Sequence, residues 1–173
     1  MTNHIQETVC AVVVATANAV SLDAFGLGMV TALKGHIAFD RFNIGLIDLP
    51  RNLFHDAFVF GHNVSGRTTG HQRTLDQSVV EAAIHAGDGF YFGHEDPVQW
   101  LNRFPRFGPV LDSGIRAMLA VPVKQTGQVV AALVFASCNP QAYEQKSLAL
   151  ASAIGASVAD RIAALGSSID TSG

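Results

Sequence analysis

The chain has 173 residues, of which 49% are hydrophobic and only 14% are charged, a composition typical of one ordered globular domain and not of a disordered chain. A net charge of −3, without any cluster of Lys and Arg, argues against a nucleic-acid-binding protein. Two cysteines are too few for a disulfide framework, so we expect a reducing, cytoplasmic setting.

The first segment of interest is an apolar run at residues 9–20, which has the length of a signal-peptide core. No Lys or Arg precedes this run, whereas a secretory signal begins with basic residues. The run is also shorter than the ~20 apolar residues of a membrane span. Its valines recur at helical spacing, so we expect a first helix at residues 6–19 that packs in the core or in a subunit interface.

A second helix is predicted to begin after Ser21, which can cap it, and to stop at Gly35. Two strands should follow at residues 39–49 and 53–60, joined by a turn at residues 50–52. Their aromatic residues point to a buried sheet.

The middle of the chain is predicted to consist of loops and short elements. Residues 61–73 are polar and rich in glycine, which indicates a loop with at most a short strand. Asp76 is placed to cap a helix that ends at Gly87, and a short strand should follow at residues 89–92. Asp96 is placed to cap the next helix.

After a predicted loop at residues 105–113, residues 114–140 have the pattern of two strands joined by a polar turn. Gly127 in that turn can adopt the positive φ that a tight hairpin requires. The second strand is apolar on both faces, so the sheet should be covered on both sides. We therefore expect this hairpin at the centre of a three-layer domain.

The last helix is predicted at residues 143–165, with residues 1–166 forming a single domain and residues 167–173 a disordered tail. Its apolar stripe consists of Leu150, Ile154, Val158 and Ile162. A second seam consists of the small residues Ala151, Gly155, Ala159 and Ala163. The first helix is apolar nearly all round, and a helix of that kind must be buried on more than one side. We therefore expect a homodimer through the N- and C-terminal helices.

Taken together, these elements predict an α+β fold with a central antiparallel sheet of about five to six strands. The terminal helices should cover one face of the sheet. The middle helices and loops should cover a pocket on the other face.

The order of these elements resembles the GAF domain, a sensory module related to PAS, over residues 17–164. The resemblance rests on four strings: TLDQSVVEAAIHAGDGFYF, SGIRAMLAVPV, QVVAALVFAS and YEQKSLALASAIGASVADRIA. Within that family, the strings most resemble the N-terminal GAF domains of bacterial regulators of the formate-hydrogenlyase-activator type. Ala117 stands where that family's strand often has Ser.

The resemblance implies a ligand site between the sheet and the middle helices. Carried onto this sequence, its lining would consist of Phe42, Ile44, Phe58, Phe60, Val79, Ala83, Phe92, Trp100, Phe104 and Phe135. The alternative is that these side chains only fill the core. From its own chemistry, Arg116 could hold an anionic ligand or pair with an acid such as Asp112.

Seven histidines are many for this length, and those at 62, 71 and 94 could converge with Glu95 and Asp96. None has the spacing of a metal motif, so we expect solvated loop histidines and no metal site. No motif points to a particular cofactor, nor to a catalytic residue.

The sequence therefore predicts a non-enzymatic small-molecule-sensing domain, the input module of a bacterial signalling or transcription-regulating protein. One alternative is a thiol-dependent enzyme of the free-methionine-sulfoxide-reductase type, whose cysteines the resemblance places in loops around the pocket. Cys10 and Cys138 lie outside those loops, so neither should be needed for function. The other alternative is a pure dimerisation module with a filled pocket. We expect no direct contact with nucleic acid or membrane.

Overall fold

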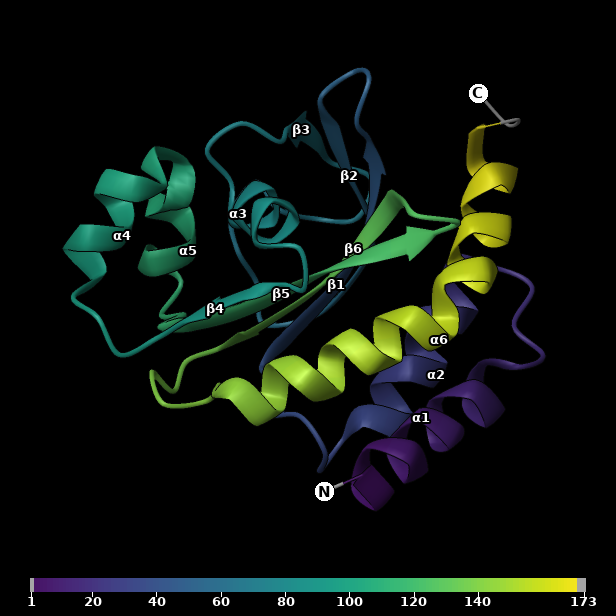
Figure 1. The fold of residues 1–173 in the computed structure, drawn as a ribbon. Coiled ribbons are helices and arrows are strands. Elements are labelled where there is room, and N and C mark those ends of the chain that lie inside the picture. The colour runs from purple at the N-terminus through teal and green to yellow at the C-terminus, as the bar shows by residue number, and fades with distance from the viewer. Residues whose placement is uncertain (1, 171–173) are drawn as a thin grey trace.

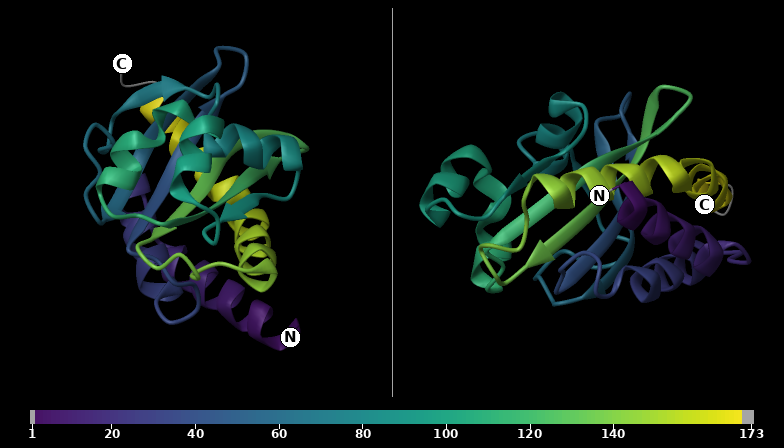
Figure 2. Two further views of the ribbon diagram at one scale, coloured as in Figure 1. Left: turned by 90° about the vertical axis from the view of Figure 1, so that its left-hand side faces the viewer. Right: turned by 60° about the horizontal axis from the view of Figure 1, so that its bottom comes forward.

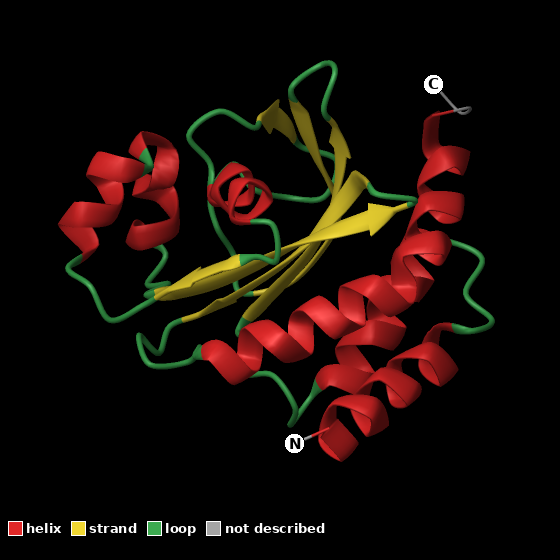
Figure 3. Ribbon diagram, viewed as in Figure 1, coloured by secondary structure: helices red, strands yellow, loops and turns green. Residues whose placement is uncertain are grey.

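A six-stranded antiparallel sheet forms the middle layer of the computed structural model, which describes residues 2–170 (Figures 1 and 3). The strand order is β3-β2-β1-β6-β5-β4. The strands are β1 (Arg41–Asp48), β2 (Leu53–Gly61), β3 (Gln72–Thr74), β4 (Phe90–Phe92), β5 (Ala117–Gln125) and β6 (Gln128–Ser137).

Helices cover both faces of this sheet (Figure 2). On one face, which we call the helix-covered face, lie α1 (Thr2–Thr16), α2 (Leu22–Leu33) and α6 (Gln145–Asp170). On the other, which we call the pocket face, lie α3 (Val79–Ala86), α4 (Pro97–Arg103), the 3₁₀ turn η1 (Pro105–Phe107) and α5 (Gly108–Asp112). The predicted fold class is confirmed.

The predicted hairpin forms β5 and β6, and β6 lies between β1 and β5 in the interior of the sheet. Thr126 and Gly127 form its turn with φ of 49° and 80°, the doubly positive pattern of a tight hairpin. Along β6 the side chains alternate between the layers. Leu133 and Phe135 pack with the terminal helices, whereas Val134 and Ala136 face the middle helices. Burial on both sides explains why the strand is apolar throughout.

The terminal helices pack as the sequence indicates. Ser21 caps α2 by accepting a hydrogen bond from the N–H of Ala24 at 3.1 Å. Helix α1 ends at Thr16, earlier than expected, and the Arg161 guanidinium of α6 donates to the carbonyls of Thr16 and Ala19. By length and composition alone, residues Gln145–Ser167 of α6 could cross a membrane. The apolar stripe of that segment is buried against the sheet, as in the core helices of globular domains.

The seam of small residues on α6 faces inward, so it is not available for the homodimer that is expected through the terminal helices. A Cβ atom added to Gly155 would lie 3.6 Å from Cγ2 of Val123 in β5. Ala151 and Ala159 are buried within the same subunit. Exposed apolar side chains remain on several elements, and on α1 they include Val14, which is 76% exposed.

Three local predictions in the middle and at the end of the chain were wrong. Ser78, not Asp76, caps α3, because the Ser78 hydroxyl accepts from the N–H of Glu81 while Asp76 accepts from Asn52. Residues 105–113 form η1 and α5 instead of a loop, since Phe107 and Val110 bury their side chains there. Helix α6 continues to Asp170, past the expected start of a disordered tail, and residues 171–173 of that tail lie outside the described residues.

A β-bulge in β2 decides which side chains of that strand face which layer. Ile44 of β1 pairs with Phe58, and the next residue, Gly45, pairs with Asp56, so Ala57 is the extra residue. In a regular strand Asp56 and Phe58 would share a face. The bulge turns Phe58 to the helix-covered face and leaves Asp56 on the pocket face.

Candidate functional site

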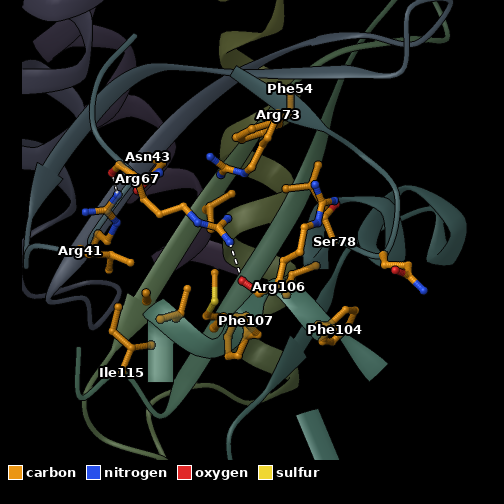
Figure 4. A pocket seen from close by; sticks show the side chains of 18 of the residues that line it. Arg41, Asn43, Phe54, Arg67, Arg73, Ser78, Phe104, Arg106, Phe107 and Ile115 are labelled. Atoms are coloured by element: carbon orange, nitrogen blue, oxygen red, sulfur yellow. Dashed lines mark hydrogen bonds between the residues drawn. The ribbon is translucent and has the colours of Figure 1, made fainter. Parts of the chain in front are cut away.

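A cavity of about 70 Å³ lies between the pocket face of the sheet and the segment from α3 to α5 (Figure 4). Its apolar wall is built from side chains of β2, β5 and β6 and of residues 104–115, the segment that contains η1 and α5. This wall includes Phe54, Phe104, Phe107, Ile115, Met118 and Val134. Apolar walls with a few converging polar groups are typical of sites for small molecules.

The polar side of the cavity is lined by four arginines, out of 11 Lys and Arg residues in the whole chain. Arg41 begins β1, Arg67 lies in the loop between β2 and β3, Arg73 is in β3, and Arg106 is in η1. Figure 4 shows their side chains converging from these separate segments on one cavity.

Within the described part of the chain, only one carboxylate forms an ion pair with any of these four cations. Asp56 is fully buried, and its two oxygens accept from Nη1 and Nη2 of Arg73 at 2.5 and 3.3 Å. Asn43 also donates to Asp56, at 3.1 Å. Among the described residues, no Asp or Glu lines the cavity itself. The surroundings of the cavity therefore carry more positive than negative charge.

The other three guanidinium groups donate to uncharged oxygens. Arg41 donates to the carbonyls of His62, at 2.8 Å, and of Arg67. Arg67 donates through Nη2 to the carbonyl of Arg106 at 2.8 Å. Arg106 in turn donates to Thr74, through its hydroxyl and its carbonyl, and to the carbonyl of Asp76. These contacts hold the loops around the cavity together without neutralising the charge.

The electrostatic consequence is visible in the pKa values of two arginines. Burial lowers the pKa of Arg67 to about 10, and the nearby guanidinium of Arg73 adds to the shift. Burial also lowers the pKa of Arg41, against the attraction of Asp56. A pKa of about 10 still leaves Arg67 protonated at neutral pH. The positive surplus therefore persists under physiological conditions.

The N-terminus of α3 lines the same cavity through Ser78, Val79 and Val80. The first N–H groups of a helix carry a partial positive charge. Gln77, just before this helix, adopts a left-handed φ of 54°. The helix end therefore adds to the positive potential of the arginines.

The structure brings some of the expected site residues to this cavity. Val79 and Phe104 line it. Ala83, Phe92 and Trp100 belong to the same buried layer but not to the lining, and the rings of Trp100 and Phe104 are stacked with centroids 6.0 Å apart. Trp100 therefore lies behind the lining residue Phe104 and does not itself line the cavity.

Arg116 does not line the cavity and does not pair with Asp112. Its Nη1 donates to the carbonyls of Leu111 and Ile115, at 2.8 and 2.7 Å. It ties α5 to the start of β5 instead.

The remaining expected residues lie on the opposite face of the sheet. They are Phe42, Ile44, Phe58, Phe60 and Phe135, which pack with the terminal helices. The expectation that they line the pocket is therefore corrected. On β6, which is apolar on both faces, hydrophobicity does not indicate the side. On β1 the apolar side chains take the face opposite the polar cavity, and on β2 the bulge at Ala57 reverses the alternation.

The sequence interpretation missed the arginines and Asp56. A signal was present in β1, where Arg41 and Asn43 alternate with Phe42 and Ile44 at the period of a strand. Polar residues at alternate positions of an otherwise buried strand indicate a polar cavity on one face. Arg67 and Arg106 lie in irregular segments and gave no such signal.

Metal binding finds no support in the part of the chain that the structure describes. No group of three or more His, Cys, Asp or Glu residues there could hold an ion. His62 donates through Nε2 to the carbonyl of Ser113 at 2.6 Å, and His71 and His94 are exposed. A second cavity, of about 320 Å³, lies beside His4, His36 and Lys146 on the helix-covered side and lacks a comparable charge cluster.

Comparison with known proteins gives one family match. The sequence profile of the GAF domain matches residues 12–163. No protein of curated function is similar to this chain at a significant level.

Among solved structures, the chain is similar to the GAF domain of an Acinetobacter phosphoenolpyruvate-protein phosphotransferase, with 19% identity, TM-score 0.75 and coverage of 98% of this chain and 99% of that one. It is similar to the free methionine-R-sulfoxide reductase of Neisseria meningitidis, with 14% identity, TM-score 0.70 and coverage of 95% and 91%. It is also similar to the GAF domain of a two-component sensor histidine kinase from Bacillus halodurans, with 17% identity, TM-score 0.64 and coverage of 86% and 99%. At these identities the similarity establishes the fold alone.

Proposed function

The chain belongs to the GAF domain family, and we propose that it is a non-enzymatic sensor that binds a small molecule in the arginine-lined cavity. The observation that carries this proposal is the cavity itself, where four guanidinium groups and an apolar wall converge from separate segments. Burying charge without a partner of opposite sign is unfavourable, so a core that served only stability would not contain these arginines.

The architecture offers a route from the cavity to the rest of a signalling protein. Val134 of β6 lines the cavity, and its neighbour Phe135 packs against the terminal helices on the other face. A ligand that shifts β6 therefore changes the packing of α1 and α6. We propose that these helices carry the signal of a cytoplasmic metabolite to an output domain, as in a transcriptional regulator or a sensor kinase.

The similarity to a sulfoxide reductase raises the alternative of a thiol enzyme. Neither cysteine lines the cavity. Burial and the carboxylate of Asp40 raise the pKa of the Cys138 thiol, which makes it a weaker nucleophile at neutral pH. Cys10 is exposed on α1, in the helical layer across the sheet. This placement favours binding over thiol chemistry.

The test is native mass spectrometry of the freshly purified protein, with a Val134→Phe variant to fill the cavity as control. We expect the wild type to carry a small molecule that the variant lacks. Adding that molecule back should change the fluorescence of Trp100, which is 7% exposed and stacks on Phe104. A Cys10→Ser/Cys138→Ser double variant should respond unchanged.

A wild type that neither carries a small molecule nor responds to any fraction of a cell extract would contradict the proposal. It would favour the dimerisation module with an unused pocket. Loss of the response in a folded double cysteine variant would favour the thiol enzyme instead.

A further inference from the structure

Building on the sensing function proposed above, we infer that the ligand is a small organic dianion, a dicarboxylate or a phosphate monoester. Its charged end is bound by Arg67 together with Arg106, and its uncharged body contacts the wall formed by Phe104, Phe107 and Ile115. Carboxylate and phosphate groups share the chemistry that a guanidinium recognises.

The charge balance is the first argument. The chain as a whole carries a net charge of −3, yet four guanidinium groups and one carboxylate meet at this cavity. The surplus is therefore a local feature, which an anion with two negative charges would largely neutralise. Placing like charges together in a partly buried site is unfavourable without such a partner.

The free hydrogen-bond donors are the second argument, and they separate the roles of the arginines. Arg73 is engaged with Asp56 through both Nη atoms, and Arg41 is engaged with two carbonyls through both of its own. Arg67 uses only Nη2, on the carbonyl of Arg106, so its Nε and Nη1 groups can donate to a ligand. Arg106 retains Nε. Arg67 is thus the principal contact, and Arg41 positions its backbone.

The size and walls of the cavity are the third argument. A volume of about 70 Å³ holds about five to seven water molecules at roughly 10–15 Å³ each. This space suits an acidic head with a short body and excludes a nucleotide. The apolar wall leaves the uncharged part of the ligand on its own side, so both negative charges, whether of one phosphate or of the two carboxylates of a short dicarboxylate, should face the arginines.

The N-terminus of α3 strengthens the same assignment. Ser78, Val79 and Val80 line the cavity, and helix N-termini stabilise anions. The helix end and the guanidinium groups therefore contribute to the same positive potential in the cavity.

Calorimetric and thermal-shift titrations with inorganic phosphate and with succinate test this inference, using sodium chloride at equal ionic strength as reference. Succinamide, which has the shape of succinate without its charge, is the matched neutral probe. We expect phosphate and succinate to bind and succinamide not to bind. The ratio of the two affinities then tells a phosphate ligand from a dicarboxylate.

The decisive comparison is between two arginine variants. Arg67→Gln removes the principal contact, whereas Arg51→Gln removes an arginine that is 72% exposed outside the cavity. We expect Arg67→Gln to weaken anion binding roughly 10-fold to 100-fold, since bonds between charged groups contribute that much. Arg51→Gln should bind as the wild type does. Arg67→Lys keeps the positive charge but loses the planar guanidinium that can donate two hydrogen bonds to one anion. Its affinity for the anion should fall between those of the other two variants.

The outcomes separate this inference from the proposed function. Equal anion binding in Arg67→Gln and Arg51→Gln, or no binding of either anion beyond the chloride reference, overturns the dianion. A neutral co-purified ligand that phosphate and succinate do not displace also overturns it but leaves the sensor intact. Arg67-dependent anion binding without any change in amide exchange of α1 and α6 supports the dianion and contradicts the sensor.

Discussion

The two faces of the sheet bury very different side chains. On the helix-covered face the buried polar side chains include Thr8 and Thr16, which are uncharged. Their hydroxyls donate hydrogen bonds to carbonyls one turn earlier in α1. On the pocket face the buried residues include Arg41 and Asp56, which carry full charges. One face thus supplies apolar burial, whereas the other holds charged groups that stability alone does not require. The difference supports the proposal that the ligand binds at the pocket face.

The largest effect should come from a cavity on the helix-covered face. Phe42 is fully buried, and its ring lies 5.0 Å from that of Phe135. Phe42→Ala should lower the free energy of unfolding by about 3–5 kcal/mol, from lost burial and the cavity left behind. Val134→Ala on the pocket face should cost only roughly 1.5 kcal/mol, at about 0.8 per methyl group. Urea unfolding measures both, and equal losses would contradict the division of roles between the faces.

The second largest loss of stability should come from removing a buried charge on the pocket face. Asp56→Asn leaves the Arg73 guanidinium without its carboxylate, which should lower the free energy of unfolding by about 3 kcal/mol. Adding Arg73→Met to the same protein should restore much of that loss, because the unpaired cation is gone. If the double variant is no more stable than Asp56→Asn, the pair does not organise this face.

The outer surface of the helical layer gives a third test. Val14 on α1 is 76% exposed, and we expect this surface to form the homodimer predicted from the sequence. Val14→Asp should weaken the dimer at least tenfold, roughly 1.4 kcal/mol, without changing the stability of the subunit. Val98→Asp, at a valine 61% exposed on α4, is the control and should leave the dimer intact. A monomeric wild type in light scattering would contradict the dimer. A dimeric Val14→Asp variant would place its interface elsewhere.

The smallest effect should come from an acid at the edge of the sheet. The backbone N–H of Cys138, helped by the Ser137 hydroxyl, lowers the pKa of the exposed Asp40 below its ordinary value of 3.8. Because the folded-state pKa is the lower one, the stabilisation is complete above pH 3.8 and is lost as the pH falls through the folded-state value. At an exposed site the effect should stay below about 1 kcal/mol.

Thermal unfolding of Asp40→Asn against pH measures this effect. The difference from the wild type should be present at neutral pH and disappear in acid, whereas Asp88→Asn, at another exposed aspartate, is the control. A difference that grows as the pH falls would reverse the assigned sign. Removing the Asp40 charge should also speed alkylation of Cys138, since that charge helps to raise the thiol pKa.

Much of the fold could be predicted from the sequence because its signals are local. The apolar stripe of α6 recurs at helical spacing, Ser21 caps α2, and Gly127 has the positive φ of the hairpin turn. The strand apolar on both faces predicted the three layers, since only burial on both sides explains that pattern. Each of these signals lies within one element or between neighbouring elements.

Tertiary structure alone decided the site. Ala57, the extra residue of the bulge in β2, places the side chains of Phe58 and Asp56 on opposite faces of the sheet. No hydrophobicity pattern indicates such a bulge. Arg67 and Arg106 are far apart in the sequence and lie in irregular segments, and they meet because the loops they belong to fold over the same face of the sheet. Charge convergence of this kind is a property of the assembled chain, since each arginine by itself looks like an ordinary polar residue of a loop or strand end.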